Sequence, residues 1–214
     1  MKTSDRIVQE SLLLFNKHGE RSITTNHIAA HLGISPGNLY YHFRNKEEII
    51  YQIFRHYQDY MREHFSIPDS GELTPEDLTR YLEAAFSAMW QYRFLFYDLP
   101  GLLARNAPLS EDYHAFVRSE LAPLLARAFS KFAEIGFLSV KPGDILPLAT
   151  NAWLIAKFWF PFWQSIRPDV PITEETSKLG IRQVLSLLKP YVQPSFAECF
   201  GAMEARYPLP VHAI

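Results

Sequence analysis

The chain has 214 residues, of which 48% are hydrophobic and 14% aromatic, so it can bury a large core and is not expected to be disordered. The net charge is −2, but residues 1–46 hold six lysines and arginines against three acidic residues, which suggests that this basic part meets a polyanion. The single cysteine excludes an intramolecular disulfide framework, and MKTSDRIVQE lacks the apolar stretch of a signal peptide, so we expect a cytoplasmic protein.

Apolar residues at helical spacing predict two helices near the N-terminus. Residues 4–18 carry a stripe that includes Ile7, Leu12 and Phe15. Residues 25–32 form a shorter stripe, for which Thr24 or Thr25 can act as the N-cap. Gly33 ends this second helix, because glycine readily adopts the positive φ of a tight turn.

Two further helices follow at once. Ser35 is placed as an N-cap, and Pro36 falls at the first helical position, where its missing N–H has no cost. This third helix extends to about His42. A fourth begins at Asn45, whose side chain and Glu48 three residues later resemble a capping box.

The remaining residues also predict helices and no strands. A turn-rich linker occupies residues 66–77, and no run of alternating polar and apolar residues follows it. Helices are expected near 75–97, 102–106, 109–136, 143–166, 174–190 and 195–206. The predicted fold is therefore all-α, with a helical head at 1–64, ending in a linking helix, and a larger helical body at 65–214.

The stretch GISPGNLYYHF contains the pattern G-x-S-x-G, which marks the nucleophilic serine of many hydrolases. That serine must sit between a strand and a helix, whereas HIAAHL before Gly33 reads as a helix. Ser35 is therefore interpreted as a helix cap, and we expect no catalytic residue and no enzyme.

A helix, a three-residue turn and a second helix form the arrangement that places a helix in the DNA major groove. Leu39 and Phe43 share the inner face of the third helix, because they are four residues apart. The outer face holds surface aromatics and small polar groups, which suit contact with phosphates and thymine methyls. These residues are Gly37, Asn38, Tyr40, Tyr41 and His42. An ordinary helical hairpin with aromatic packing is the alternative.

The segment ITTNHIAAHLGISPGNLYYHFRNKEEII resembles the DNA-binding region of TetR/AcrR-type transcriptional regulators. RIVQESLLLFNKHG resembles the first helix of that family, with Glu10-Ser11 in place of its common pair of small residues. The resemblance covers about the first 60 residues. It implies a homodimer that binds a palindromic double-stranded DNA operator, usually as a repressor.

The resemblance also implies roles for individual residues of a helix-turn-helix at about 24–43. Thr24 or Thr25, Ser35 and Lys46 would contact phosphate, and Tyr40 would touch phosphate or a methyl group. Bases would be met by Gly37, Asn38, Tyr41 and His42. The recognition helix has no arginine or lysine, so the bidentate contact to guanine is missing there.

Metal and cofactor chemistry finds little support in the sequence. His27 and His31 are four residues apart, a spacing that can hold zinc, but no third ligand is evident nearby. The two histidines are better explained as polar residues that lie near the DNA phosphate backbone. No glycine-rich phosphate loop is present, so we expect neither a metal nor a cofactor.

The body is rich in aromatic residues, which suggests a small lipophilic or aromatic effector. Most of them are expected to be core or interface residues, but together they can line a cavity. The candidates are Phe86, Trp90, Phe94, Asn151, Trp153, Phe158 and Phe162. The stretch 145–166 is long enough for a bilayer, yet Lys157, polar residues and two prolines favour a buried helix and no membrane contact.

Three functions are compatible with the sequence. A ligand-responsive transcriptional regulator leads, ahead of an architectural DNA-binding protein without a ligand and an all-helical enzyme or carrier. Helices 143–166 and 174–190 are expected to pair with their copies across a two-fold axis. The fourth helix, from Lys46 to about His64, is expected to act as a lever between effector and DNA.

Overall fold

The structure, a computed structural model, describes residues 2–65, 67 and 73–209. Contacts between residues divide the chain into two compact units. Unit 1 consists of Met1–Tyr60 and Tyr92–His114, and unit 2 of Met61–Gln91 and Ala115–Ile214. The first division lies close to the expected boundary at residue 64, but residues 92–114 group with the N-terminal helices.

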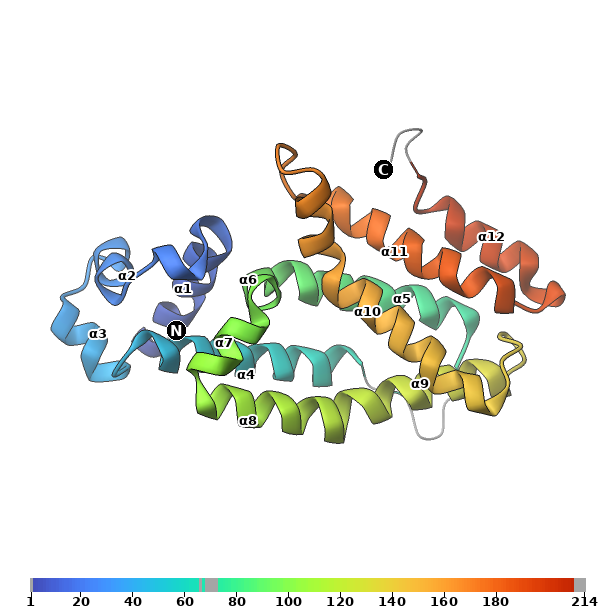
Figure 1. The fold of residues 1–214 in the computed structure, drawn as a ribbon, viewed down its shortest axis with the longest axis horizontal. Helices are drawn as coiled ribbons and strands as arrows, with labels where there is room; N and C mark the ends of the chain where they lie inside the picture. Colours follow the sequence, from blue (N-terminus) through green and yellow to red (C-terminus); the bar gives the residue numbers. More distant parts are fainter. Residues whose placement is uncertain (1, 66, 68–72, 210–214) are drawn as a thin grey trace. The chain divides into compact units, whose positions relative to one another are not determined.

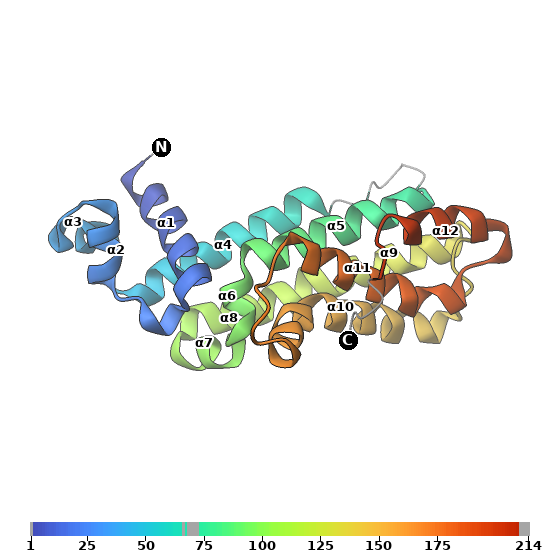
Figure 2. The same cartoon turned by 90° about the horizontal axis from the view of Figure 1, so that it is seen from above.

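Unit 1 contains the four N-terminal helices at the expected positions. They are α1 (Thr3–His18), α2 (Thr25–Leu32), α3 (Pro36–His42) and α4 (Lys46–His64), with a 3₁₀ turn, η1 (Glu20–Ser22), before α2; α4 belongs to this unit up to Tyr60. Figure 2 shows α2 and α3 together beside α1. The core between these helices includes Ile7, Ile28 and Leu39, none of which is exposed to solvent.

The second segment of unit 1 packs against the first. It comprises α6 (Arg93–Tyr97), α7 (Leu99–Arg105) and the start of α8 (Ala107–Phe116). The Asn106 side chain donates to the Glu47 carbonyl at 2.9 Å, and the Tyr51 hydroxyl donates to Asp112 at 2.6 Å. These bonds attach α4 to α8 within unit 1.

Unit 2 is a bundle around three long helices, α5 (Pro75–Gln91), α10 (Pro142–Ile166) and α11 (Glu174–Leu188), which pack on one another (Figure 1). α9 (Ala122–Glu134) packs on α10, and α12 (Ala197–Ala205) packs on α5. The short turns η3 (Lys189–Tyr191) and η4 (Pro194–Phe196) connect α11 to α12. Gly180 of α11 allows the close approach, since a Cβ there would lie 2.1 Å from Phe86 Cε1.

The expected helix at 75–97 is interrupted. α5 ends at Gln91 and α6 begins at Arg93, because Tyr92 leaves the helical conformation with φ −108° and ψ 24°. Its ring is buried and meets the Tyr57 ring edge-on, with 5.6 Å between the centroids. Packing against α4 accompanies the break, and no pattern within 75–97 indicates it.

The expected helix at 109–136 also contains an irregularity. Val117–Leu121 form a wider π-helical turn, η2, between α8 and α9. Pro123 lies two residues after Leu121. A proline in a helix lacks the N–H for the regular bond and crowds the carbonyl four residues earlier. The helix at 102–106 instead begins at Leu99, and that at 195–206 begins with η4.

The all-α prediction is confirmed. In the described residues, the only strand-like feature is an isolated antiparallel bridge between Leu138 and Val192. None of the helices in those residues combines the length and apolar character needed to cross a membrane.

Candidate nucleic-acid interface

The turn between α2 and α3 is built by the residues that the sequence indicated. The Thr24 hydroxyl accepts from the His27 N–H at 3.2 Å and caps α2. The Ser35 hydroxyl accepts from the Asn38 N–H at 3.1 Å and caps α3. Gly33 has φ +67°, the left-handed conformation that lets the chain reverse between the two helices. The cap interpretation of Ser35 is confirmed.

The two faces of α3 differ as expected. Leu39 and Phe43 are buried, whereas Gly37 and Asn38 are exposed on the outer side. Tyr41 is 85% exposed, which is unusual for so large an aromatic residue. Such a side chain is available to a partner.

Neighbouring side chains orient this face. The Tyr41 ring meets the His42 ring edge-on at 5.1 Å between centroids, and His42 is partly buried. Tyr40 is 49% exposed, and its hydroxyl is 3.0 Å from Thr25 Oγ1 of α2. The two helices therefore share a hydrogen bond on the same side of the motif.

The two histidines of α2 each have a partner within the chain. His27 Nδ1 accepts from the Thr24 N–H at 3.3 Å, and His31 Nε2 lies 2.9 Å from Glu10 Oε2. Among the residues that the structure describes, no three or more His, Cys, Asp or Glu side chains are arranged to hold a metal ion.

The start of α4 is more complex than the sequence suggested. Asn45 Oδ1 accepts from the Glu48 N–H at 2.9 Å, as expected of a cap, but the Glu48 carboxylate bonds the Arg44 N–H rather than that of Asn45. The Lys46 ammonium lies 2.7 Å from Glu20 Oε1 and also donates to the Glu20 carbonyl. Lys46 thus has two acceptors inside unit 1.

Arg44 is a cation near α3 that is not among the residues expected to contact DNA. Its side chain is 89% exposed, and it follows directly after α3 and Phe43. Its charge and position next to the outer aromatics are the signals that mark it as a second candidate for phosphate contact.

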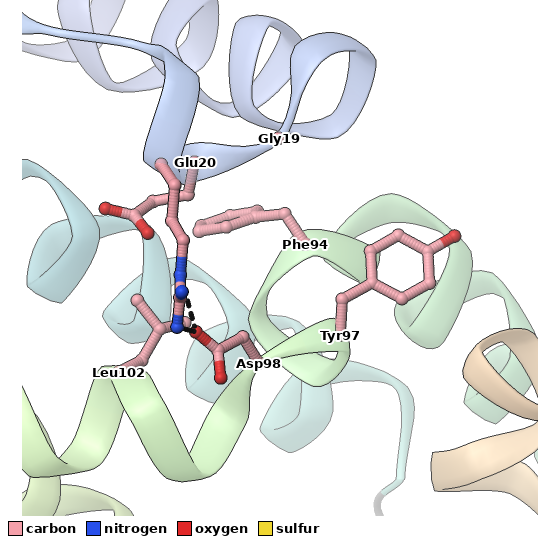
Figure 3. Close-up of a pocket in the computed structure, with 7 residues that line it drawn as sticks. Gly19, Glu20, Phe94, Tyr97, Asp98 and Leu102 are labelled. Carbon is pink, nitrogen blue, oxygen red and sulfur yellow. Dashed lines mark hydrogen bonds and ion pairs between the residues drawn. The ribbon is translucent and has the colours of Figure 1, made fainter.

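A small cavity lies beside η1 in unit 1 (Figure 3), with a volume of about 190 Å³. Phe94 and Tyr97 of α6 and Leu102 of α7 form its apolar wall, opposite Gly19 and Glu20. Arg21, which also lines the cavity, forms an ion pair with Asp98 at 2.6 Å. Burial raises the pKa of the Tyr97 phenol, consistent with an apolar surrounding.

A second hollow lies on the outer face of α10 in unit 2. Its volume is about 400 Å³, and it is lined by Leu154, Ile155, Phe158, Trp159, Phe162 and Gln183. Large apolar side chains continue along this face and are between 39% and 56% exposed. They are Leu146, Leu154, Phe158, Phe162 and Ile166. Such a stripe is larger than scattered surface hydrophobics and indicates an interaction surface.

Lys157 lies next to this stripe. Its ammonium is 5.2 Å from the centre of the Trp153 ring and 5.0 Å from that of Phe158. Burial lowers the pKa of Lys157, because the apolar surroundings disfavour its charge.

The candidate effector residues do not form one group. Phe86 is fully buried against α11, and Trp90 packs on Phe160, with 5.8 Å between ring centroids. Phe94 belongs to unit 1, where its ring contacts that of Phe15 at 5.1 Å, so it does not extend the helix that carries Trp90. Asn151, Trp153, Phe158 and Phe162 lie on α10, with Asn151, Phe158 and Phe162 exposed.

Two family profiles match the sequence. Residues 7–53 match "Bacterial regulatory proteins, tetR family", and residues 56–200 match "Bacterial transcriptional repressor" of the same family. A curated relative, the HTH-type transcriptional repressor KstR2 of Mycolicibacterium smegmatis, is 30% identical over 86 residues. That match spans 40% of this chain and 42% of the relative's length.

Solved structures match over nearly the whole chain. A TetR-family transcriptional regulator from Marinobacter aquaeolei VT8 is 43% identical, with a TM-score of 0.89 over 97% of this chain and 99% of the other. A transcriptional regulator from Saccharomonospora viridis in complex with choline is 17% identical and shares the fold, with a TM-score of 0.67 over 89% of this chain and 97% of the other. The profile matches and the similarity to the Marinobacter protein show that the chain belongs to the TetR family of bacterial transcriptional regulators.

Proposed function

We propose that the protein binds a double-stranded DNA operator through the outer face of α3 and represses transcription there. The observation that carries this proposal is the exposed Tyr41 on a helix whose other side, at Leu39 and Phe43, is anchored in the core. The helix therefore has a fixed position and presents Gly37 and Asn38 beside the tyrosine. Aromatic rings and small side chains can approach base edges and thymine methyls in the major groove.

The groups around this face support phosphate contacts. Thr24, Thr25 and Ser35 lie at the N-termini of α2 and α3, where backbone N–H groups and hydroxyls favour anions. Tyr40, held by Thr25, and Lys46 at the start of α4 complete the proposed set. His42 is proposed to face bases together with Tyr41.

Selection of bound duplexes from random DNA, followed by a shift assay, tests the proposal. Tyr41→Ala is expected to relax base preference and to weaken specific binding by about 1–3 kcal/mol. Leu13 of α1 is also a large exposed residue, so Leu13→Ala is a control that should leave the preference unchanged. Unchanged affinity and preference for Tyr41→Ala would exclude this docking of α3.

We also propose that two copies associate through the outer face of α10, with α11 beside it. The exposed stripe that includes Leu154, Phe158 and Phe162 supports this, since such a surface is stabilised by burial against an identical copy. A dimer would present two recognition helices to an inverted repeat, about 34–36 Å apart in successive major grooves.

Sedimentation velocity at micromolar concentration tests this association. Phe158→Asp is expected to shift the protein to monomer, because a carboxylate would have to be buried in the contact. Val170 is exposed to the same extent but lies beyond α10, so Val170→Asp is the control. A wild-type monomer, or a dimer that tolerates both changes equally, would contradict the proposal.

An apolar or aromatic small molecule is proposed to act as the effector that weakens operator binding. The half-buried Trp90 and Trp153, outside the stripe assigned to the dimer contact, support unit 2 as the proposed location. Such a molecule can switch the protein only if it binds the DNA-incompetent state more tightly. A coupling of about 1–3 kcal/mol would change operator affinity about 5- to 150-fold.

Reciprocity provides the test. Operator DNA must weaken binding of the effector by the same factor by which the effector weakens DNA binding. A titration of candidate molecules with and without operator measures both. Equal dissociation constants in the two titrations would show that the molecule does not control DNA binding. The alternative function, an architectural DNA-binding protein, would then be favoured.

A further inference from the structure

Glu20 connects the two sides of the helix-turn-helix within unit 1. It begins η1, which leads into α2, and its partner Lys46 begins α4, which follows α3. The ion pair between them, 2.7 Å from Lys46 Nζ to Glu20 Oε1, therefore joins the segment before α2 to the segment after α3.

The carboxylate of Glu20 is shared by a second cation. Arg105, the last residue of α7, places Nη2 at 2.9 Å from Glu20 Oε2. The Glu20 side chain is only 9% exposed, whereas those of Lys46 and Arg105 are 20% and 40% exposed. One nearly buried acid thus faces two bases, and its negative charge is divided between them.

Lys46 is held more firmly than a surface lysine. A protonated lysine has three N–H donors, and the Lys46 ammonium has two acceptors on Glu20: the carboxylate and the main-chain carbonyl, the latter at 2.9 Å. Arg44, two residues earlier, shows the contrasting case: its side chain is 89% exposed, and its ion pair with Glu48, at 3.9 Å, lies on the surface. The position next to α3 does not by itself require an inward-directed cation.

We propose that Glu20 acts as an internal anion that competes with DNA phosphate for the Lys46 ammonium. This inference rests on the proposed function, in which Lys46 meets a phosphate. Glu20 is then a positioning residue: it directs Lys46 inward in the free protein, and phosphate must replace it or share the ammonium with it. Arg105 moderates this hold, because it draws on the same carboxylate.

The slope of log K against log salt concentration separates this role from a purely structural one. Each phosphate neutralised by a cation adds about −0.9 to the slope on duplex DNA. Glu20→Gln removes the competing charge with little change in shape, so binding to a random duplex should tighten and the slope should steepen by up to about 0.9 per subunit. Glu47→Gln removes the same charge one residue from Lys46 and controls for net charge.

Lys46→Met provides the decisive background. In the Lys46→Met protein, Glu20→Gln should change the salt-dependence slope by no more than Glu47→Gln does. An equal effect of Glu20→Gln and Glu47→Gln in the presence of Lys46 would overturn the proposal, because the effect would then be one of net charge alone.

Arg105→Met keeps the proposal testable if Glu20→Gln does not fold, as far-ultraviolet circular dichroism would show. Without Arg105 the carboxylate serves Lys46 alone, so the slope should become shallower, and only when Lys46 is present. A steeper slope would contradict the proposal. Failure of the proposed function is distinguishable from both results, because the wild-type protein would then not bind any duplex at low salt.

Discussion

Replacing Gly180 with alanine is expected to destabilise unit 2, although alanine favours helix. The added Cβ would lie 2.1 Å from Phe86 Cε1 and 2.6 Å from Trp159 Cδ1, far inside ordinary contact distance. Phe86 is fully buried, and Trp159 is fixed by a 2.6 Å hydrogen bond from its indole N–H to the Thr176 carbonyl. Neither ring can withdraw unless α5 or α10 moves away from α11.

The magnitude follows from two opposing effects. Overpacking a core costs about 1–3 kcal/mol, and contacts this short favour the upper end. The higher helix propensity of alanine stabilises the folded state by about 1 kcal/mol relative to glycine. A net loss of about 2 kcal/mol is therefore expected, which corresponds to a decrease of about 4–8 °C in melting temperature for a chain of this size.

Urea unfolding followed by tryptophan fluorescence measures this loss, because Trp90, Trp153, Trp159 and Trp163 all belong to unit 2. Gly201→Ala is the matched control. Gly201 lies within α12, and a Cβ there would have no atom within 4 Å, so this variant should gain up to about 1 kcal/mol. A Gly180→Ala protein as stable as wild type would refute the packing argument.

Three other outcomes are expected. Ser35→Ala should lower the free energy of unfolding of unit 1 by about 1 kcal/mol through loss of the α3 cap, measured by hydrogen exchange of the α3 amides. Thr25→Val and Tyr40→Phe should show a coupling of about 0.5–1.5 kcal/mol in a double-mutant cycle of DNA affinity, and additive effects would mean that their hydrogen bond does not orient Tyr40. Burial raises the pKa of Tyr92 from 10.0 to about 12, so the unfolded chain loses this proton first and stability should fall as the pH rises from 10 to 12. Tyr92→Phe should reduce that fall in urea unfolding at pH 9 and 11, and an unchanged pH dependence would exclude Tyr92 as its source.

The helix-turn-helix could be predicted from the sequence because its signals are local. The Thr24 and Ser35 caps each bond a backbone N–H three residues later, and Gly33 supplies the positive φ of the turn. The burial of Leu39 and Phe43 follows from the helical period alone. Each of these features depends on residues within a few positions in the chain, so the sequence contains the information for it.

Tertiary structure decided what depends on distant partners. Tyr92 leaves the helix where its ring meets Tyr57, and Phe94 packs on Phe15, which separates it from the aromatic residues of α10. The same applies to Lys46, whose partner Glu20 is 26 residues earlier and is shared with Arg105. Charge and spacing mark Lys46 as a cation near DNA, but only the folded chain shows that a buried carboxylate already binds it, because ion pairing depends on distance in space.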